Sequence, residues 1–169
     1  APKLSDSLTD LGLKLFRFKT GTPARVDKRS IDFSKTKEQP GSSEPLAFSY
    51  MTKTFDRPMV PCHSTYTNPR THEIIRENLH LAPKYSGIIE GVGARYCPSI
   101  EDKVVRFADR DAHLLFLEPE GLMTNEIYVQ GMSTGMPYEI QEKFMRTIAG
   151  LENVKIMRPA YAIEYDGIV

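Results

Sequence analysis

The chain has 169 residues, 40% of them hydrophobic and 26% charged, which is typical of one globular domain with its own core. Lys and Arg together number 22, and so do Asp and Glu, so the net charge of zero argues against a freestanding, strongly basic RNA-binding protein. No apolar run approaches the roughly 20 residues that span a bilayer, and no signal peptide is recognisable. We therefore expect a soluble cytoplasmic protein without a membrane segment.

The first half of the chain is predicted to contain two strands, a loop and a helix. Alternating apolar and basic residues predict a strand over Leu13–Phe18, which the following glycine and proline break. The polar stretch Lys35–Pro45 predicts a mobile loop, and Met59–Thr65 is typical of a short strand. Asn68 then caps a helix that runs to about His80, because a proline follows the cap and apolar residues recur at helical spacing.

The second half is predicted to alternate helices and strands. Ser99 begins a helix with a capping-box-like pattern. Another helix starts at Pro137 and ends at Gly150. The four further strands are His113–Leu117, Glu126–Gln130, Lys155–Met157 and Tyr161–Tyr165. About six strands and three helices in mixed order predict one α+β domain with a mixed sheet over residues 1–169.

The most informative stretch is Gly91–Phe107, a glycine-bearing loop followed by a helix start. Free amides at a helix N-terminus favour an anion such as pyrophosphate, and the Arg95 guanidinium adds a fork suited to phosphate. The helix start and Arg95 would also favour the thiolate of Cys97, which lies two residues before the cap at Ser99. The alternative interpretation is a capped surface helix with a packed cysteine.

Other cofactor and metal motifs are weak or missing. Gly91 and Gly93 lack the third glycine of a dinucleotide fingerprint, because Tyr96 stands in its place. Cys62 and Cys97 match no zinc pattern, and the four histidines have no metalloprotease spacing. We therefore expect no metal site.

The segment from 14 to 29 carries six cations and one anion. A loop of this kind can follow an RNA backbone, and the alternative is a solvated edge that protects a strand from aggregation. The residues predicted to contact nucleic acid are Arg17, Lys19, Arg25, Lys28 and Arg29.

Together, several runs carry a family resemblance. They are Phe18–Arg25, Arg29–Ser34, Thr65–Asn68, Thr71–Ile75, Tyr85–Gly87, Ile89–Gly91, Arg95–Lys103, Phe116–Leu122 and Tyr161–Asp166. On these runs, the chain resembles the GidA/MnmG family of tRNA-modifying flavoproteins over about Leu11–Asp166. The run Arg95–Lys103 favours this family over the related folate- and flavin-dependent tRNA uracil methyltransferase TrmFO.

The resemblance implies an activity for the intact protein. Such an enzyme binds FAD on a glutathione-reductase-like domain, takes electrons from NADH and acts with the GTPase MnmE. The two proteins add an aminomethyl or carboxymethylaminomethyl group to carbon 5 of the wobble uridine of tRNA. The one-carbon unit comes from methylenetetrahydrofolate, and the enzyme is a cytoplasmic homodimer.

The resemblance also assigns residues. Cys97 matches a catalytic cysteine, expected to add to carbon 6 of the uridine. The stretch matched to NAD binding comprises Gly93, Ala94, Arg95, Tyr96, Pro98, Ser99, Ile100, Glu101, Asp102, Lys103, Val104, Arg106 and Phe107.

The family's FAD fingerprint and its C-terminal helical region have no counterpart in this sequence. We therefore expect the chain to correspond to a domain inserted between two parts of the flavin domain. By itself it should bind little FAD and should not catalyse the reaction. The alternative from another class of function is a non-catalytic tRNA-binding or interaction module.

Overall fold

The computed structural model describes residues 2–42, 44, 46–54, 58–89, 91–93 and 97–169. Its strands are β1 (Leu15–Thr22), β2 (Arg25–Asp27), β3 (Lys37–Gln39), β4 (Cys62–Tyr66), β5 (Val92–Gly93), β6 (Leu114–Pro119), β7 (Glu126–Gln130), β8 (Ile156–Arg158) and β9 (Tyr161–Ile168). Its α-helices are α1 (Pro2–Asp10), α2 (Pro69–Glu77), α3 (Ile100–Arg106) and α4 (Tyr138–Met145). Short 3₁₀ turns cover Lys28–Ser30, Phe33–Lys35 and Leu79–Leu81.

The strands form two sheets. The larger has the order β3-β4-β6-β7-β2-β8, and all of its neighbouring strands are antiparallel. The smaller has the order β5-β1-β9, in which β1 runs parallel to β5 and antiparallel to β9. The structure contains parallel and antiparallel strand pairs, and its helices are separate from the strands. It therefore confirms the predicted α+β class with mixed pairing.

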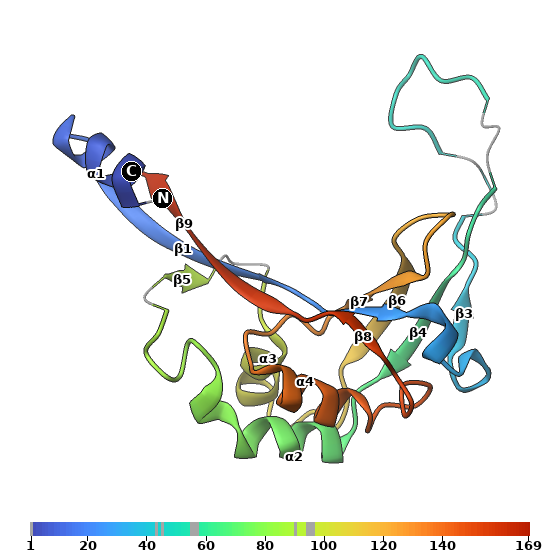
Figure 1. The fold of residues 1–169 in the computed structure, drawn as a ribbon. Coiled ribbons are helices and arrows are strands. Elements are labelled where there is room, and N and C mark those ends of the chain that lie inside the picture. The colour runs from blue at the N-terminus through green and yellow to red at the C-terminus, as the bar shows by residue number, and fades with distance from the viewer. Residues whose placement is uncertain (1, 43, 45, 55–57, 90, 94–96) are drawn as a thin grey trace.

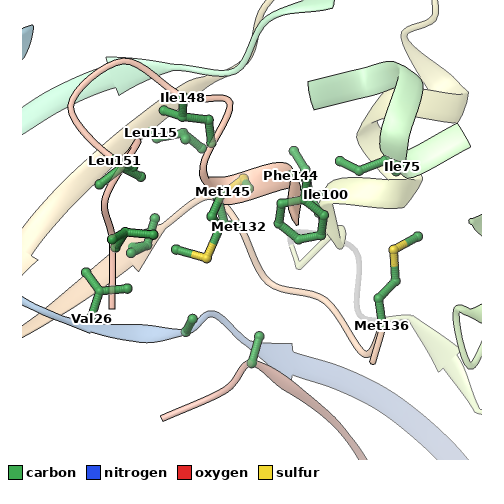
Figure 2. Packing of buried hydrophobic residues seen from close by; sticks show 14 of the residues in the cluster. Val26, Ile75, Ile100, Leu115, Met132, Met136, Phe144, Met145, Ile148 and Leu151 are labelled. Carbon is green, nitrogen blue, oxygen red and sulfur yellow. The ribbon is translucent and has the colours of Figure 1, made fainter. Parts of the chain in front are cut away.

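The core lies between the six-stranded sheet and helices α2, α3 and α4, which gather on one side of it (Figure 1). Alternate residues of β6 and β7 point into this core, so Leu115 and Val129 are buried while their neighbours are more exposed. Figure 2 shows Phe144 of α4 close to Ile75 of α2 and Ile100 of α3. The helices are therefore fixed by apolar contacts with each other and with the sheet.

Strands β1 and β9 continue beyond the body as a two-stranded ribbon with α1 at its far end (Figure 1). The two ends of the chain lie close together there. Along the ribbon, Phe18 stacks on Tyr165 with ring centroids 5.3 Å apart. Arg17 forms an ion pair with Asp166 at 3.0 Å. Pairs across the two strands, rather than a buried core, hold the ribbon together.

Helix α2 begins as predicted. The Asn68 side chain accepts the amide hydrogen of Thr71, and the Thr71 hydroxyl accepts that of Asn68, so both halves of a capping box are present. The regular helix ends at Glu77 and a 3₁₀ turn follows. The predicted end near His80 was therefore slightly late.

The described residues contain four α-helices and nine strands, more than the three and six predicted. Helix α1 was missed, and so were β2, β3 and β5, which are too short for an alternating pattern to be recognised. Strand β3 lies within the stretch Lys35–Pro45 that was predicted to be a loop, and it pairs with β4.

Two predicted boundaries were wrong. The glycine at position 21 does not break β1, because Gly21 and Thr22 still pair with Ala162 and Tyr161 of β9. Helix α4 ends at Met145, before Gly150, because the chain after Met145 forms tighter hydrogen-bonded turns instead of continuing the helix.

Candidate functional site

The thiol of Cys97 lies against the inner end of β1. Its Sγ atom is 3.1 Å from the Thr20 hydroxyl and 4.0 Å from the Gly21 carbonyl oxygen. Cys97 belongs to the segment between β5 and α3, and it is half-buried. Strand β1 therefore positions a thiol that is 77 residues away in sequence from Thr20.

Cys97 borders a small pocket between the two sheets and α3. Lys19 and Gly21 contribute from β1, Glu101 from α3, and Thr134 from the segment after β7. The free volume of about 10 Å³ is close to what one water molecule needs. This pocket can therefore hold a polar contact beside the thiol, but not a nucleotide ring.

Glu101 is the unusual member of the pocket. It is 1% exposed, and its Oε2 atom has no hydrogen-bond partner among the described residues. Burial raises the pKa of its carboxyl, although the Thr134 hydroxyl, Lys19 and the Ser99 hydroxyl each favour the charged form. A buried polar atom without a partner costs about 1–3 kcal/mol, so Glu101 is only partly compensated by the described residues around it.

Lys19 is 6% exposed and forms part of a buried charge network. Its Nζ atom is 3.8 Å from Asp102 Oδ2, while Lys84 donates to Asp102 Oδ1 at 2.6 Å. Burial opposes ionisation of Asp102, but the hydrogen bond from Lys84 and the charges of both lysines outweigh it, so the Asp102 pKa is lowered. Burial and the neighbouring Asp102 raise the pKa of Tyr85 to about 12.

The amides at the start of α3 already have partners within the chain. The Ile100 amide donates to the Ser133 carbonyl oxygen at 2.8 Å, and the Asp102 amide donates to the Ser99 hydroxyl at 3.4 Å. The predicted cap at Ser99 is therefore confirmed, but the reverse contact of a capping box is replaced by the pairing of Asp102 with lysines. These two amides are not available to a phosphate group.

The other residues predicted to bind a dinucleotide are divided between core and surface. Val104 is buried in the core with Ile100. Lys103 donates to the Gly131 carbonyl oxygen at 3.1 Å, and burial lowers its pKa. Four members of the stretch are exposed: Gly93, Pro98, Arg106 and Phe107. Ala94, Arg95 and Tyr96 lie outside the described residues.

The two predicted nucleic-acid residues on β1 have internal partners. Arg17 lies on the ribbon, and its guanidinium contacts both Glu164 and Asp166. Lys19 faces the pocket beside Cys97 and pairs with Asp102. Lys19 therefore shares a pocket with the thiol, and its contact with nucleic acid stays a prediction.

The other three predicted nucleic-acid residues lie in or directly after β2. Arg25 donates to Glu120 at 3.1 Å and covers the Tyr128 ring. Arg29 donates to Asp27, and these hydrogen bonds lower the pKa of Asp27 to about 2. Lys28 is exposed and forms no ion pair within the described part of the chain. Contact of this region with nucleic acid stays a prediction.

Histidines and aromatic residues elsewhere have structural roles. His72 stacks on His113 with ring centroids 5.0 Å apart and bonds the Thr67 hydroxyl through Nε2 at 2.7 Å. Tyr66, at the end of β4, is 56% exposed. Among residues 2–42, 44, 46–54, 58–89, 91–93 and 97–169, no group of His, Cys, Asp and Glu could hold a metal ion. Within the same described residues, no helix is long and apolar enough to cross a membrane.

Sequence analysis did not bring Thr20, Lys19 and Glu101 together with Cys97. Lys19 was assigned to nucleic acid because it lies in a basic segment, and Glu101 to a dinucleotide because the family resemblance matches its stretch to NAD binding. One local signal could have linked Glu101 to Cys97: Glu101 lies in the first turn of the helix that follows the cysteine. Strands β1 and β9 pair with each other and both line the pocket, and no local sequence pattern predicts that pairing.

Comparisons with known proteins place this geometry in a family. A family model described as "Glucose inhibited division protein A" matches residues 1–169. The MnmG tRNA uridine 5-carboxymethylaminomethyl modification enzyme of Thermodesulfovibrio yellowstonii is 60% identical over 164 residues, which are 97% of this chain and 26% of that protein. The enzyme of the same name from Bacillus subtilis is 59% identical over 167 residues, which are 99% of this chain and 27% of that protein.

Solved structures agree with the sequence comparisons. The structure of Aquifex aeolicus GidA in the form I crystal matches with a TM-score of 0.86 and 53% identity, covering 97% of this chain and 28% of that one. The chain therefore belongs to the glucose-inhibited division protein A family, and the resemblance predicted from sequence is confirmed. It spans little more than a quarter of the length of the relatives that it matches.

Proposed function

We propose that the full-length protein carrying this chain is a tRNA-modifying enzyme in which Cys97 is the nucleophile. The reaction adds an aminomethyl or carboxymethylaminomethyl group to carbon 5 of the wobble uridine. The observation that carries the proposal is the position of Cys97, which is half-buried beside a polar pocket and held by Thr20. The high identity to two MnmG enzymes supports the choice of reaction.

The proposed chemistry requires a thiolate at the thiol position. Addition of Sγ to carbon 6 of uridine moves an electron pair toward carbon 5, which can then attack the one-carbon unit. Loss of the carbon 5 proton and departure of the thiolate restore the ring. Thr20 supports the first step, because its hydroxyl lies within hydrogen-bond distance of the sulfur.

The cofactors are proposed on the family resemblance. FAD supplies redox chemistry and is expected mainly on parts of the protein other than this chain. NADH is proposed to contact the surface-exposed members of the Gly93–Phe107 stretch. The described residues do not fit a dinucleotide at the start of α3, because its amides have internal partners and the adjacent pocket has space for about one water.

We also propose that the chain is a domain inserted into a larger flavoprotein. Strands β1 and β9 pair along their whole length, from Leu15 opposite Ile168 to Thr22 opposite Tyr161, so chain entry and exit lie side by side. Such a ribbon allows insertion without disturbing the host domain. A homodimer, the GTPase partner MnmE and a cytoplasmic location are proposed for the whole protein on the same resemblance.

The two cysteines provide a matched test of the reaction. In the full-length protein, Cys97→Ser should abolish wobble-uridine modification, whereas Cys62→Ser should retain it, because Cys62 lies in β4 and does not line the pocket. Modified nucleosides would be measured by mass spectrometry after digestion of the tRNA. Normal modification by Cys97→Ser would exclude this cysteine as the nucleophile.

The NADH contact is tested separately. Titration with NADH, followed by amide hydrogen exchange, should show protection within Gly91–Phe107 of the full-length protein. Protection confined to other parts of the protein would contradict a nicotinamide contact on this chain.

A further inference from the structure

We propose that Cys97 and Glu101 share one proton beside the Lys19 ammonium. The Glu101 carboxylate takes the thiol proton when Cys97 reacts and returns it when Cys97 leaves. This inference rests on the proposed role of Cys97 as nucleophile. The three side chains come from β1, from the segment before α3 and from α3 itself, and they line one pocket.

The position of the Glu101 carboxyl is the first support. Glu101 is 1% exposed, yet its Oε2 atom has no partner among the described residues. A carboxyl oxygen that is buried without a partner is unfavourable unless another state of the site uses it. No hydrogen bond joins Glu101 Oε2 to the Cys97 sulfur, and the pocket has space for about one water, so the proposed proton path runs through one water.

The charge balance of the pocket is the second support. Asp102 is 3.8 Å from Lys19 and also accepts a hydrogen bond from Lys84 at 2.6 Å, so its charge is already matched by Lys84. The buried ammonium of Lys19 is then available to Cys97 and Glu101, whereas the Lys103 ammonium donates to the Gly131 carbonyl oxygen. A thiolate and a carboxylate in the same buried pocket would repel each other, so either Cys97 or Glu101 keeps a proton.

The other groups around the thiol are consistent with this arrangement. Lys103 on α3 interacts electrostatically with Cys97, and the Thr20 hydroxyl on β1 is 3.1 Å from the sulfur. The remaining described lining residues, from Pro83, the 133–135 segment and Ala162, carry no charge. Burial raises the pKa of Glu101, which brings it closer to the range of an effective proton acceptor at neutral pH.

The step balances without another reagent. The S–H bond of Cys97 breaks, its proton moves to the Glu101 carboxylate, and the sulfur electron pair forms the bond to carbon 6 of uridine. When that bond breaks at the end of the reaction, the electron pair returns to sulfur. The Glu101 carboxylic acid then gives the proton back to Cys97.

The test compares thiol reactivity with turnover in the full-length protein. Iodoacetamide labelling of the Cys97 peptide would be followed by mass spectrometry as a function of pH, with the Cys62 peptide as internal control. Glu101→Gln should shift the labelling profile of Cys97 to lower pH and speed labelling severalfold near neutrality, because the competing carboxylate is gone. The same variant should lower the rate of tRNA modification at least tenfold.

Lys19→Met should have the opposite effect on labelling. Loss of the ammonium should slow Cys97 labelling severalfold, and Lys19→Arg should restore most of it, while Cys62 labelling stays unchanged in all variants. Faster labelling with slower turnover in Glu101→Gln is a combination that simple disruption of the pocket would not produce. If Glu101→Gln does not fold, a Cys97 labelling profile unchanged by Lys19→Met would still overturn the proposal.

Two results would overturn the inference. One is a Cys97 labelling profile unchanged by Lys19→Met. The other is a folded Glu101→Gln variant with normal labelling and normal turnover. If Cys97→Ser is inactive in either case, the proposed function survives and only proton sharing fails. If Cys97→Ser modifies tRNA normally, the proposed function fails whatever the labelling shows.

Discussion

The body and the ribbon of this chain are stabilised in different ways. In the body, apolar residues of β6 and β7 are closed off by α2, α3 and α4, and residues such as Phe144 and Leu115 are fully buried. In the ribbon, aromatic rings and ion pairs meet across β1 and β9 while Phe16 and Tyr165 remain partly exposed. The pocket lies where the two regions join, so the body fixes α3 while the ribbon strand brings Lys19 and Thr20 to it.

The largest expected effect is on stability, and it is tested by comparing a phenylalanine of the body with one of the ribbon. Phe144→Ala should lower the free energy of unfolding by about 3–5 kcal/mol, because it leaves a cavity among buried side chains. Phe18→Ala should cost only about 1 kcal/mol, because its ring contacts are made at a half-buried surface. Urea denaturation of the two variants measures both values, and equal losses would contradict the distinction between body and ribbon.

A smaller effect is the pH dependence of stability that arises from two histidines in the body. Burial lowers the pKa of both His72 and His113 below the usual 6.5. The unfolded chain therefore binds protons at these positions before the folded chain does, and stability should fall as pH drops below about 6.5. The control is His113→Asn, whose stability should change less between neutral and mildly acidic pH than that of the wild type. A steeper loss in the variant would contradict this assignment.

The smallest effect is expected on the ribbon surface. Arg17→Ala removes ion pairs to Glu164 and Asp166 from a half-exposed side chain. The expected loss is below about 1 kcal/mol and should shrink as salt is added, because exposed charges are screened. Denaturation at low and high salt checks this. A large loss that salt does not change would show that the ribbon depends on these pairs more than on its aromatic contacts.

Sequence reasoning was most successful where local chemistry decides structure. Asn68 followed by a proline identifies the start of α2, and short apolar runs on either side of a proline- and glycine-bearing turn identify β6 and β7. It was least successful where distant segments meet. The contact between Thr20 and Cys97 joins residues 77 positions apart, and short strands such as β5 exist only because β1 lies beside them.

In the candidate site, too, local patterns were predicted correctly and contacts between distant segments were not. Cys97 and its neighbours were identified from a local run of residues, and the family comparison confirmed the family to which that run points. Glu101 was expected to contact a cofactor, because the family resemblance matches it to a NAD-binding stretch. It is instead buried, since the turn faces β1 and the segment after β7, and periodicity along α3 does not report what covers that face.

The most direct test of Cys97 as the nucleophile is to trap its sulfur on the wobble uridine of the tRNA. Full-length protein would be incubated under turnover conditions with tRNA carrying 5-fluorouridine at the wobble position, then digested and analysed by mass spectrometry. Because a sulfur that adds to carbon 6 becomes linked to the base, we predict that the Cys97 peptide carries the nucleotide and that Cys97→Ser yields no such adduct. An adduct on another cysteine, with Cys97 unmodified, would contradict the central claim.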